Sequence, residues 1–394
     1  MIGDAPLGVA VSGGGDSMAL LALLLEAGLT PQVATVHHHL RDEAGAEVAA
    51  VVAFCADHGL IHTQLDWHWD GTGNLQDQGR RARYRLLAAW ASERALAHIA
   101  LGHTADDNAE TFLMGLSRGA GLDGLSGMRA RFKRGAVTFH RPLLSVSRAD
   151  LRDLLRAKGI AWADDPSNDD PAYHRVRIRQ AMDALSSAGI DPAAIQKTIG
   201  NLAATRSDIS LDLARALEGR FELYHGDILF DLPWLERQTM ETRRRVLKAA
   251  IRVVSGQDYP PRGDKLARLA GDLRSKSALQ GCLFSNDGTH LRVSREFAAV
   301  DAMAVPSDAV WDDRWVADGP HADGLTLRAL GEDGLTQVDD DWRALGLPRA
   351  SVLASPSIWR GATLRSAPLA GWPEGWKIRL CKDAPQLIGS ILLH

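Results

Sequence analysis

The first 110 residues alternate short apolar runs, rich in β-branched residues, with longer segments of helical periodicity. The predicted strands are 7–12, 32–38, 61–67 and 98–103, and the predicted helices begin near 17, 44, 76 and 105. Strands that alternate with helices in this way are typical of βαβ units, whose strands are parallel. The expected fold is therefore α/β, with a doubly wound parallel sheet that binds ligands at the carboxyl ends of its strands.

The turn after the first strand reads Ser-Gly-Gly-Gly-Asp-Ser. Backbone N–H groups in such a turn, together with the amino end of a helix, favour a bound anion. The turn lacks the lysine of the G-x-x-x-x-G-K-S/T loop and the third glycine of the G-x-G-x-x-G loop. It resembles the S-G-G-x-D-S loop of the PP-loop ATP pyrophosphatases. The resemblance implies that the pyrophosphate of ATP binds at Ser12, Gly13, Gly14, Gly15 and Ser17, with Asp16 near Mg²⁺. A plain turn in which Ser17 or Asp16 caps the helix is the alternative.

Four further stretches resemble the tRNA(Ile)-lysidine synthetase family in order and spacing: 36–41, 79–87, 101–128 and 141–179. The resemblance is dense over residues 7–180 and looser between 259 and 297. It implies an ATP-dependent ligase that joins free L-lysine to C2 of the wobble cytidine, C34, of tRNA(Ile) with anticodon CAU. An adenylated cytidine is the intermediate, and AMP and pyrophosphate are released. The chain departs from the family pattern R-N-x-I-R at Val176, where the asparagine is missing.

A group of polar residues follows the fourth predicted strand: His103, Asp106, Asp107, Glu110 and Thr111. Carboxylates three and four residues apart share one face of a helix. Because Mg²⁺ takes one or two protein carboxylates besides phosphate and water, Asp16 with Asp107 is the predicted magnesium site. Asp106 or Asp107 is expected to take a proton from lysine, and the choice between them stays open. The alternative is that these acids only complement the helix dipole.

The remaining predicted site residues are basic or imidazole groups. The family pattern H-x-L-R falls on His38 and Arg41, and the predicted nucleotide-binding set is completed by His38 and His103. The predicted substrate-binding set is Arg41, Arg80, Arg83, Glu110, Arg141 and Arg179, and Arg175 is a predicted catalytic residue. Solvated surface arginines at 80 and 83, and pairing of Arg175 or Arg179 with Asp164 or Asp165, are the alternatives. No metal site is expected at His37–His39, since consecutive strand residues point to opposite faces.

The net charge of −4 hides a basic segment. Between residues 129 and 179 there are 12 Lys or Arg and 6 Asp or Glu, a net of +6. A basic stripe beside a nucleotide site suits the phosphate backbone of RNA.

Three domains are expected: a catalytic domain at 1–185, a mainly helical tRNA-binding domain at 186–302 and a small β-rich tRNA-binding domain at 308–394. The last contains six tryptophans: Trp311, Trp315, Trp342, Trp359, Trp372 and Trp376. Tryptophans can stack on bases, but a role in the core is the favoured interpretation.

The composition of the chain narrows the expected cellular location and the alternative functions. The chain has no signal-peptide pattern and no apolar run long enough for a membrane span, so a cytoplasmic protein is expected. Its three cysteines form no C-x-x-C pair, which disfavours the runner-up function, a PP-loop tRNA thiolase. A small-molecule amide synthetase and a non-catalytic nucleotide- and RNA-binding module are less favoured functions. A homodimer is compatible with the sequence, which leaves the oligomeric state open.

Overall fold

The computed structural model describes residues 6–39, 44–163, 174–257, 261–338, 341–381 and 386–392. The chain divides into two compact units, Met1–Arg206 and Ser207–His394, and each is described by itself. The predicted boundaries near 185 and 302 remain predictions. Among the described residues, no helix is long and apolar enough to cross a membrane.

The first unit is built on a six-stranded sheet. Its first eight elements are those predicted from the sequence: β1 (Leu7–Ala10), α1 (Gly15–Glu26), β2 (Gln32–His37), α2 (Ala44–Asp57), β3 (His62–Asp66), α3 (Leu75–Glu93), β4 (His98–Leu101) and α4 (Ala105–Leu116). The strand order is β3-β2-β1-β4-β6-β5. All neighbours pair in parallel except β5 (Arg131–Arg134), which is antiparallel to β6 (Val137–His140). The predicted doubly wound sheet is confirmed.

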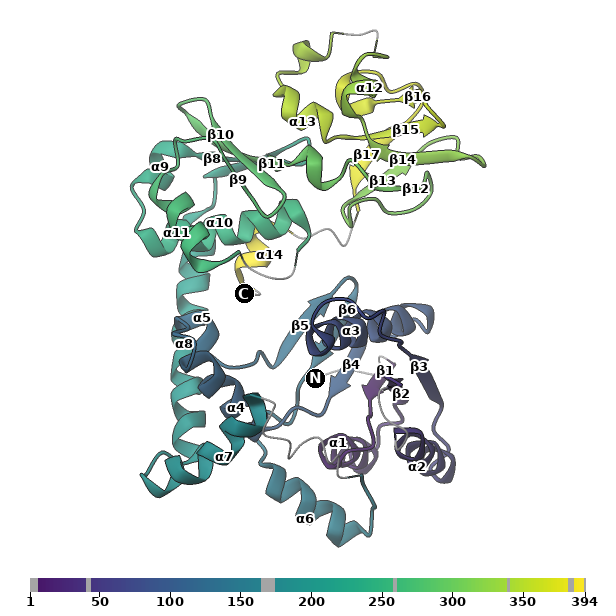
Figure 1. Ribbon diagram of the computed structural model, residues 1–394, viewed down its shortest axis with the longest axis vertical. Coiled ribbons are helices and arrows are strands. Elements are labelled where there is room, and N and C mark those ends of the chain that lie inside the picture. The colour runs from purple at the N-terminus through teal and green to yellow at the C-terminus, as the bar shows by residue number, and fades with distance from the viewer. Residues whose placement is uncertain are drawn as a thin grey trace. The chain divides into compact units, whose positions relative to one another are not determined.

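Helices cover both faces of this sheet, as Figure 1 shows, with α1 and α2 on one side and α3 on the other. Successive strand residues point to opposite faces and so enter different cores. Val9 and Ala100 pack in one cluster with residues of α1, α2 and α6 (Arg148–Lys158), whereas Ile99 and Phe139 pack with Trp90 and its neighbours on α3. Both faces of the central strands are therefore buried, as parallel sheets require.

The turns after β1 and β4 meet at one point of the sheet edge. β1 lies between β2 and β4, so the chain winds in opposite directions from these two strands. In sheets of this kind the crevice that binds ligands lies at the carboxyl ends of such strands. Gly102, which follows β4, touches the backbone of the first turn. A Cβ at Gly102 would lie 2.9 Å from the carbonyl oxygen of Asp16 and 3.0 Å from Cα of Ser17. Glycine at this position allows the two turns to approach each other.

Three helices follow the sheet. Ser147 caps α6 by accepting a hydrogen bond from the N–H of Asp150. α7 (His174–Ser187) and the first part of α8 (Pro192–Ala216) pack on α4. The buried contact joins Ala109 and Leu113 of α4 to Ile195 and Ile199 of α8. A short helix, α5 (Leu122–Leu125), lies in the glycine-rich connection after α4. The packing of α7 and α8 fixes the position of α4.

The second unit contains a sheet that the sequence pattern did not indicate. Five antiparallel strands run in the order β7-β8-β11-β10-β9: β7 (Phe221–Tyr224), β8 (Asp227–Asp231), β11 (His290–Arg295), β10 (Cys282–Asn286) and β9 (Ser277–Leu279). The expected helical content is present in α9 (Leu232–Glu236), α10 (Met240–Ser255), α11 (Gly263–Gly271) and α14 (Leu387–Leu392). The helix α10 contributes more residues to the shared core than any other element, with Val246, Leu247, Ala250 and Val254 all buried.

The last part of the second unit is β-rich, as predicted. One sheet has the order β12-β14-β15-β16: β12 (Ala304–Pro306), β14 (Leu325–Ala329), β15 (Pro356–Arg360) and β16 (Thr363–Ser366). A second sheet pairs β13 (Trp315–Asp318) with β17 (Lys377–Leu380). Trp311, Trp315, Trp359 and Trp376 are buried in these cores. The structure therefore supports the core interpretation for these four tryptophans.

We expect Gly102→Ala to destabilise the protein by about 1–3 kcal/mol, because the added methyl group collides with backbone that cannot move aside. The measurement is the urea midpoint, followed by far-UV circular dichroism. Gly121→Ala is the matched control, since Gly121 has a φ of −81° and open space where its Cβ would lie. Equal midpoints for the two variants would contradict the packing argument.

Candidate active site

The turn from Ser12 to Ser17 is closed by its own serines. The N–H of Ser12 donates to Oγ of Ser17 over 3.1 Å, and that hydroxyl donates to the carbonyl of Gly14 over 2.8 Å. Gly13 has a φ of +89°, a conformation that favours glycine. Gly14 is the N-cap of α1 and no side chain caps it, which does not fit the alternative of a plain serine or aspartate cap. The amino end of α1 is thus arranged to receive an external anion.

Arg148, the first residue of α6, joins the carboxylates of two distant elements. Its Nε lies 3.1 Å from Asp16 on α1, and one Nη lies 3.1 Å from Asp107 on α4. The other Nη lies 3.6 Å from Glu110. These three carboxylates raise the pKa of Arg148, against the effect of burial. For Asp16 burial is the stronger influence and raises the pKa of its carboxyl group, although Arg148 opposes the shift.

Glu110 is the centre of a second set of ion pairs. It is 1 % exposed and accepts hydrogen bonds from Nε of Arg175 and, over 2.9 Å, from Nε of Arg179. Arg175 also donates to Asp107 over 2.7 Å. A buried carboxylate needs such partners, so α7 and α4 are held together by charge as well as by apolar packing. The competing partners Asp164 and Asp165 lie outside the described residues.

The neighbouring aspartates of α4 have different surroundings. Asp107 forms a capping box with Thr104, accepting from its N–H and its hydroxyl, in addition to its arginine contacts. Asp106 accepts a 2.7 Å hydrogen bond from the backbone N–H of Arg148. Asp106 also lines a cavity of about 320 Å³ with Arg148, Ala149, Arg152, Asp153 and Arg156. Of these two aspartates, Asp106 is the one that faces an open space.

His103, at the end of β4, is held in one protonation state. Nε of Arg141 donates to Nδ1 of His103 over 3.2 Å, so Nδ1 is the acceptor and Nε2 carries the ring proton. Burial and the neighbouring arginines Arg83 and Arg141 lower the pKa of His103 to about 2. The ring is therefore neutral at physiological pH and offers an N–H donor.

A group of arginines surrounds the buried ring of Tyr84 on α3. Arg80, Arg83 and Arg134 lie over this ring, and Arg141 donates to its hydroxyl over 3.4 Å. Burial alone would raise the pKa of Tyr84, but Arg83, Arg141 and Arg80 outweigh it and lower the pKa to about 8. In the described part of the chain no carboxylate pairs with Arg80, Arg83 or Arg141. This Tyr84 arginine group therefore retains positive charge that an anionic ligand can neutralise.

The stretch around His38 is only partly described. The His38 ring stands edge-on to Trp67 and close to Gly79, the start of another family-like stretch. Burial, Arg83 and His37 lower the pKa of His38. The predicted residue Arg41 lies outside the described residues. Val176, at the position of the family asparagine, is 6 % exposed and so replaces an amide by buried apolar surface.

Sequence reasoning missed three residues of this site: Arg148, Thr104 and Tyr84. A usable signal existed for Thr104, because a hydroxyl followed three residues later by an acid is typical of a capping box. No local pattern indicated Arg148 or Tyr84. His37 and His39, for which no metal site was expected, lie beside Asp66, a residue that the sequence did not single out.

A family model and a solved structure each resemble part of this chain. A family model described as a PP-loop domain matches residues 3–185. A solved U34-tRNA thiolase from Methanococcus maripaludis is 18% identical over 51% of this chain and 72% of that one, with a TM-score of 0.44.

Two curated relatives cover most of the chain. The tRNA(Ile)-lysidine synthase of Ruegeria pomeroyi is 44% identical over 98% of this chain and 94% of that protein. The tRNA(Ile)-lysidine synthase of Hyphomonas neptunium is 35% identical over 74% of this chain and 82% of that protein. With similarity of this extent and a PP-loop domain at the amino end, the chain belongs to the tRNA(Ile)-lysidine synthase family.

Proposed function

We propose that this protein ligates L-lysine to C2 of the wobble cytidine of tRNA(Ile) with anticodon CAU, at the expense of ATP. The observation that carries the proposal is the 44% identity to a tRNA(Ile)-lysidine synthase along 98% of the chain. The convergence of Asp16, Asp106 and Asp107 beside the PP-loop supports it, because ATP binding alone does not require such a group. A tRNA substrate places the reaction in the cytoplasm.

In the first step the cytidine O2 attacks the α-phosphorus of ATP, and the bond to pyrophosphate breaks. The N–H groups of the Ser12–Ser17 turn and the amino end of α1 stabilise the charge that develops on the leaving pyrophosphate. At the same sheet edge, neutral His103 supplies an N–H donor and the Tyr84 arginine group supplies positive charge. Catalysis here is mostly positioning and electrostatics, since no protein nucleophile is needed.

Asp16 and Asp107 fit a magnesium ion in their charge and their placement. Each lies 3.1 Å from a different nitrogen of one guanidinium, so both already converge on a single cation. Oxygen ligands from one or two carboxylates, completed by phosphate and water, are what Mg²⁺ prefers. Bound there, the ion would neutralise charge on the phosphates of ATP. Arg148 holds these carboxylates in place.

In the second step the lysine amine attacks C2, the bond between C2 and the adenylate oxygen breaks, and AMP leaves. The amine must lose its proton, and we assign the acceptor to Asp106. The assignment follows from the cavity of about 320 Å³ that Asp106 lines, while Asp107 is committed to Thr104, Arg148 and Arg175. Asp153, on the same cavity, would attract an ammonium group of free lysine.

The tRNA backbone is proposed to lie along the basic segment 129–179. On the edge strand β5, Arg131 and Lys133 are exposed, so these cations are accessible to a phosphate backbone. We also assign tRNA binding to the second unit. Because Trp311, Trp315, Trp359 and Trp376 are core residues there, recognition by that unit would use its polar surface.

Incubation of the protein with ATP, magnesium, labelled lysine and total tRNA should transfer label to RNA.

Asp16→Asn should lower pyrophosphate release by about a hundredfold or more, because the neutral amide supports neither a metal ion nor the charge balance of the site. Filter binding of tRNA should stay within about threefold of the wild type, as electrostatic contacts to phosphates elsewhere are retained.

Asp57→Asn is the control for Asp16→Asn, since Asp57 is exposed at the end of α2. Normal pyrophosphate release by Asp16→Asn would contradict the assignment of the turn. Failure of the wild type to label RNA, with the fold intact, would contradict the lysine reaction itself.

Asp106→Asn should separate the two steps. Pyrophosphate release with tRNA and ATP should stay within about threefold, because the amide oxygen still accepts from the Arg148 N–H, while lysine transfer should fall about a hundredfold with loss of the base. Single-turnover assays of each step provide the measurement. Asp153→Asn, on the same cavity, is the matched control, expected to change lysine affinity more than the transfer rate. Equal losses in both steps for Asp106→Asn would exclude the assigned role.

Ultraviolet titration should reveal one tyrosine that ionises near pH 8, and Tyr84→Phe should remove this step. The folded-state pKa lies below the ordinary value of 10.0. The stabilisation from the phenolate is therefore fully present above about pH 10 and is lost as the pH falls through about 8. Tyr224→Phe is the control and should leave the step in place. Persistence of the step in Tyr84→Phe would rule out the proposed effect of the arginines.

A further inference from the structure

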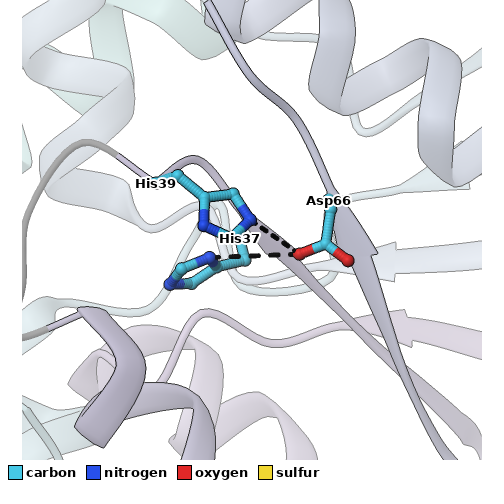
Figure 2. Close-up of side chains that lie close together, drawn as sticks. All are labelled: His37, His39 and Asp66. Carbon is cyan, nitrogen blue, oxygen red and sulfur yellow. Dashed lines mark hydrogen bonds and ion pairs between the residues drawn. The ribbon is translucent and has the colours of Figure 1, made fainter.

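Two histidines and an aspartate converge at the carboxyl ends of β2 and β3. His37 is the last residue of β2, and it pairs in register with Asp66, the last residue of β3. His39 follows two residues after His37, and Figure 2 shows both imidazole rings beside the Asp66 carboxylate. One ligand atom from each of the three side chains lies within 4.8 Å of the other two. His37 and His39 are two residues apart in the sequence and lie together, whereas the ring of His38, between them, contacts Trp67 and lies near Gly79.

The ring of His37 is largely buried and forms no hydrogen bond with the described residues. Its side chain is 12% exposed, and both ring nitrogens are shielded from solvent without a hydrogen-bond partner among the described residues. Buried polar atoms in proteins are nearly always satisfied, so the two nitrogens of this imidazole are available to a ligand beside the Asp66 carboxylate.

The separations suit a small cation. Nε2 of His39 lies 2.8 Å, and Nδ1 of His37 lies 4.0 Å, from the same oxygen of Asp66. In tetrahedral zinc sites with metal–ligand bonds of about 2.0–2.2 Å, ligand atoms are about 3.3 Å apart. The observed pair distances lie on either side of this value, so small side-chain rotations complete the geometry. Gln64 donates to Asp66 over 2.7 Å and orients the carboxylate, as groups next to metal ligands commonly do.

We propose that His37, His39 and Asp66 bind one Zn²⁺ ion. Two imidazole nitrogens and a carboxylate oxygen favour zinc over magnesium, which prefers oxygen ligands in octahedral geometry. Three protein ligands leave one position for water. Bound there, the ion joins the ends of β2 and β3 beside His38. The proposal concerns a site separate from Asp16 and Asp107 and does not depend on the ligase reaction.

Zinc chloride titrated into chelator-treated, full-length protein against a chromogenic chelator tests the site. We expect one zinc per chain in the wild type, with at least about tenfold weaker binding in His37→Ala and Asp66→Asn. His39→Asn is a third variant, since His39 has a φ of +51° and asparagine tolerates this backbone conformation. Far-UV circular dichroism of each variant verifies that it is folded.

Two controls make the result decisive. His58→Ala removes an exposed histidine of the same unit and should leave the affinity unchanged. Asp16→Asn should also leave zinc binding unchanged, which separates this site from the proposed magnesium site. Less than one zinc per wild-type chain, equal weakening by His58→Ala, or loss of zinc in Asp16→Asn would each overturn the proposal. Normal zinc binding without lysine transfer would leave it standing and refute only the ligase reaction.

Discussion

The contacts of Arg148 with Asp16, Asp107 and Glu110 are the constraint on which the site depends. The carboxylates of Asp16 on α1 and of Asp107 and Glu110 on α4 lie 3.1–3.6 Å from one guanidinium. They would repel each other if no cation stood between them. The guanidinium presents several donors in a fixed plane, so it sets the spacing of the acids as well as balancing their charge. Through the N–H of Arg148, α6 also holds Asp106. Movement of α6 would therefore alter the placement of all four acids.

Much of the first unit could be predicted because its signals are local. Each strand from β1 to β4 is a short apolar run, and each following helix has its own periodicity. Parallel pairing then brings the turns after β1 and β4 to one edge without further information. The Ser12–Ser17 turn and the acids of α4 were predicted on that basis, and the structure brings them together.

The remainder depended on contacts between residues far apart in the sequence. Arg148 and Asp16 are separated by 132 positions, and nothing local distinguishes Arg148 from other arginines of the basic segment. The sheet of the second unit pairs strands that are far apart in the sequence, such as β8 with β11, and its strand β9 has only three residues. Asp66 comes to lie beside His37 only because β3 pairs with β2 in one register. A slip of one residue would turn its side chain to the other face.

The hydrogen bond from Arg141 to His103 has a consequence for kinetics. Across the physiological pH range the His103 imidazole stays neutral and the Arg141 guanidinium stays charged. The charge of this pair therefore does not change with pH in that range. An acid-side change in turnover must then come from other groups, such as the carboxylates, His38 or the reactants themselves. Because the charge of the His103–Arg141 pair stays fixed, a pH dependence of the reaction reports the titration of the other groups.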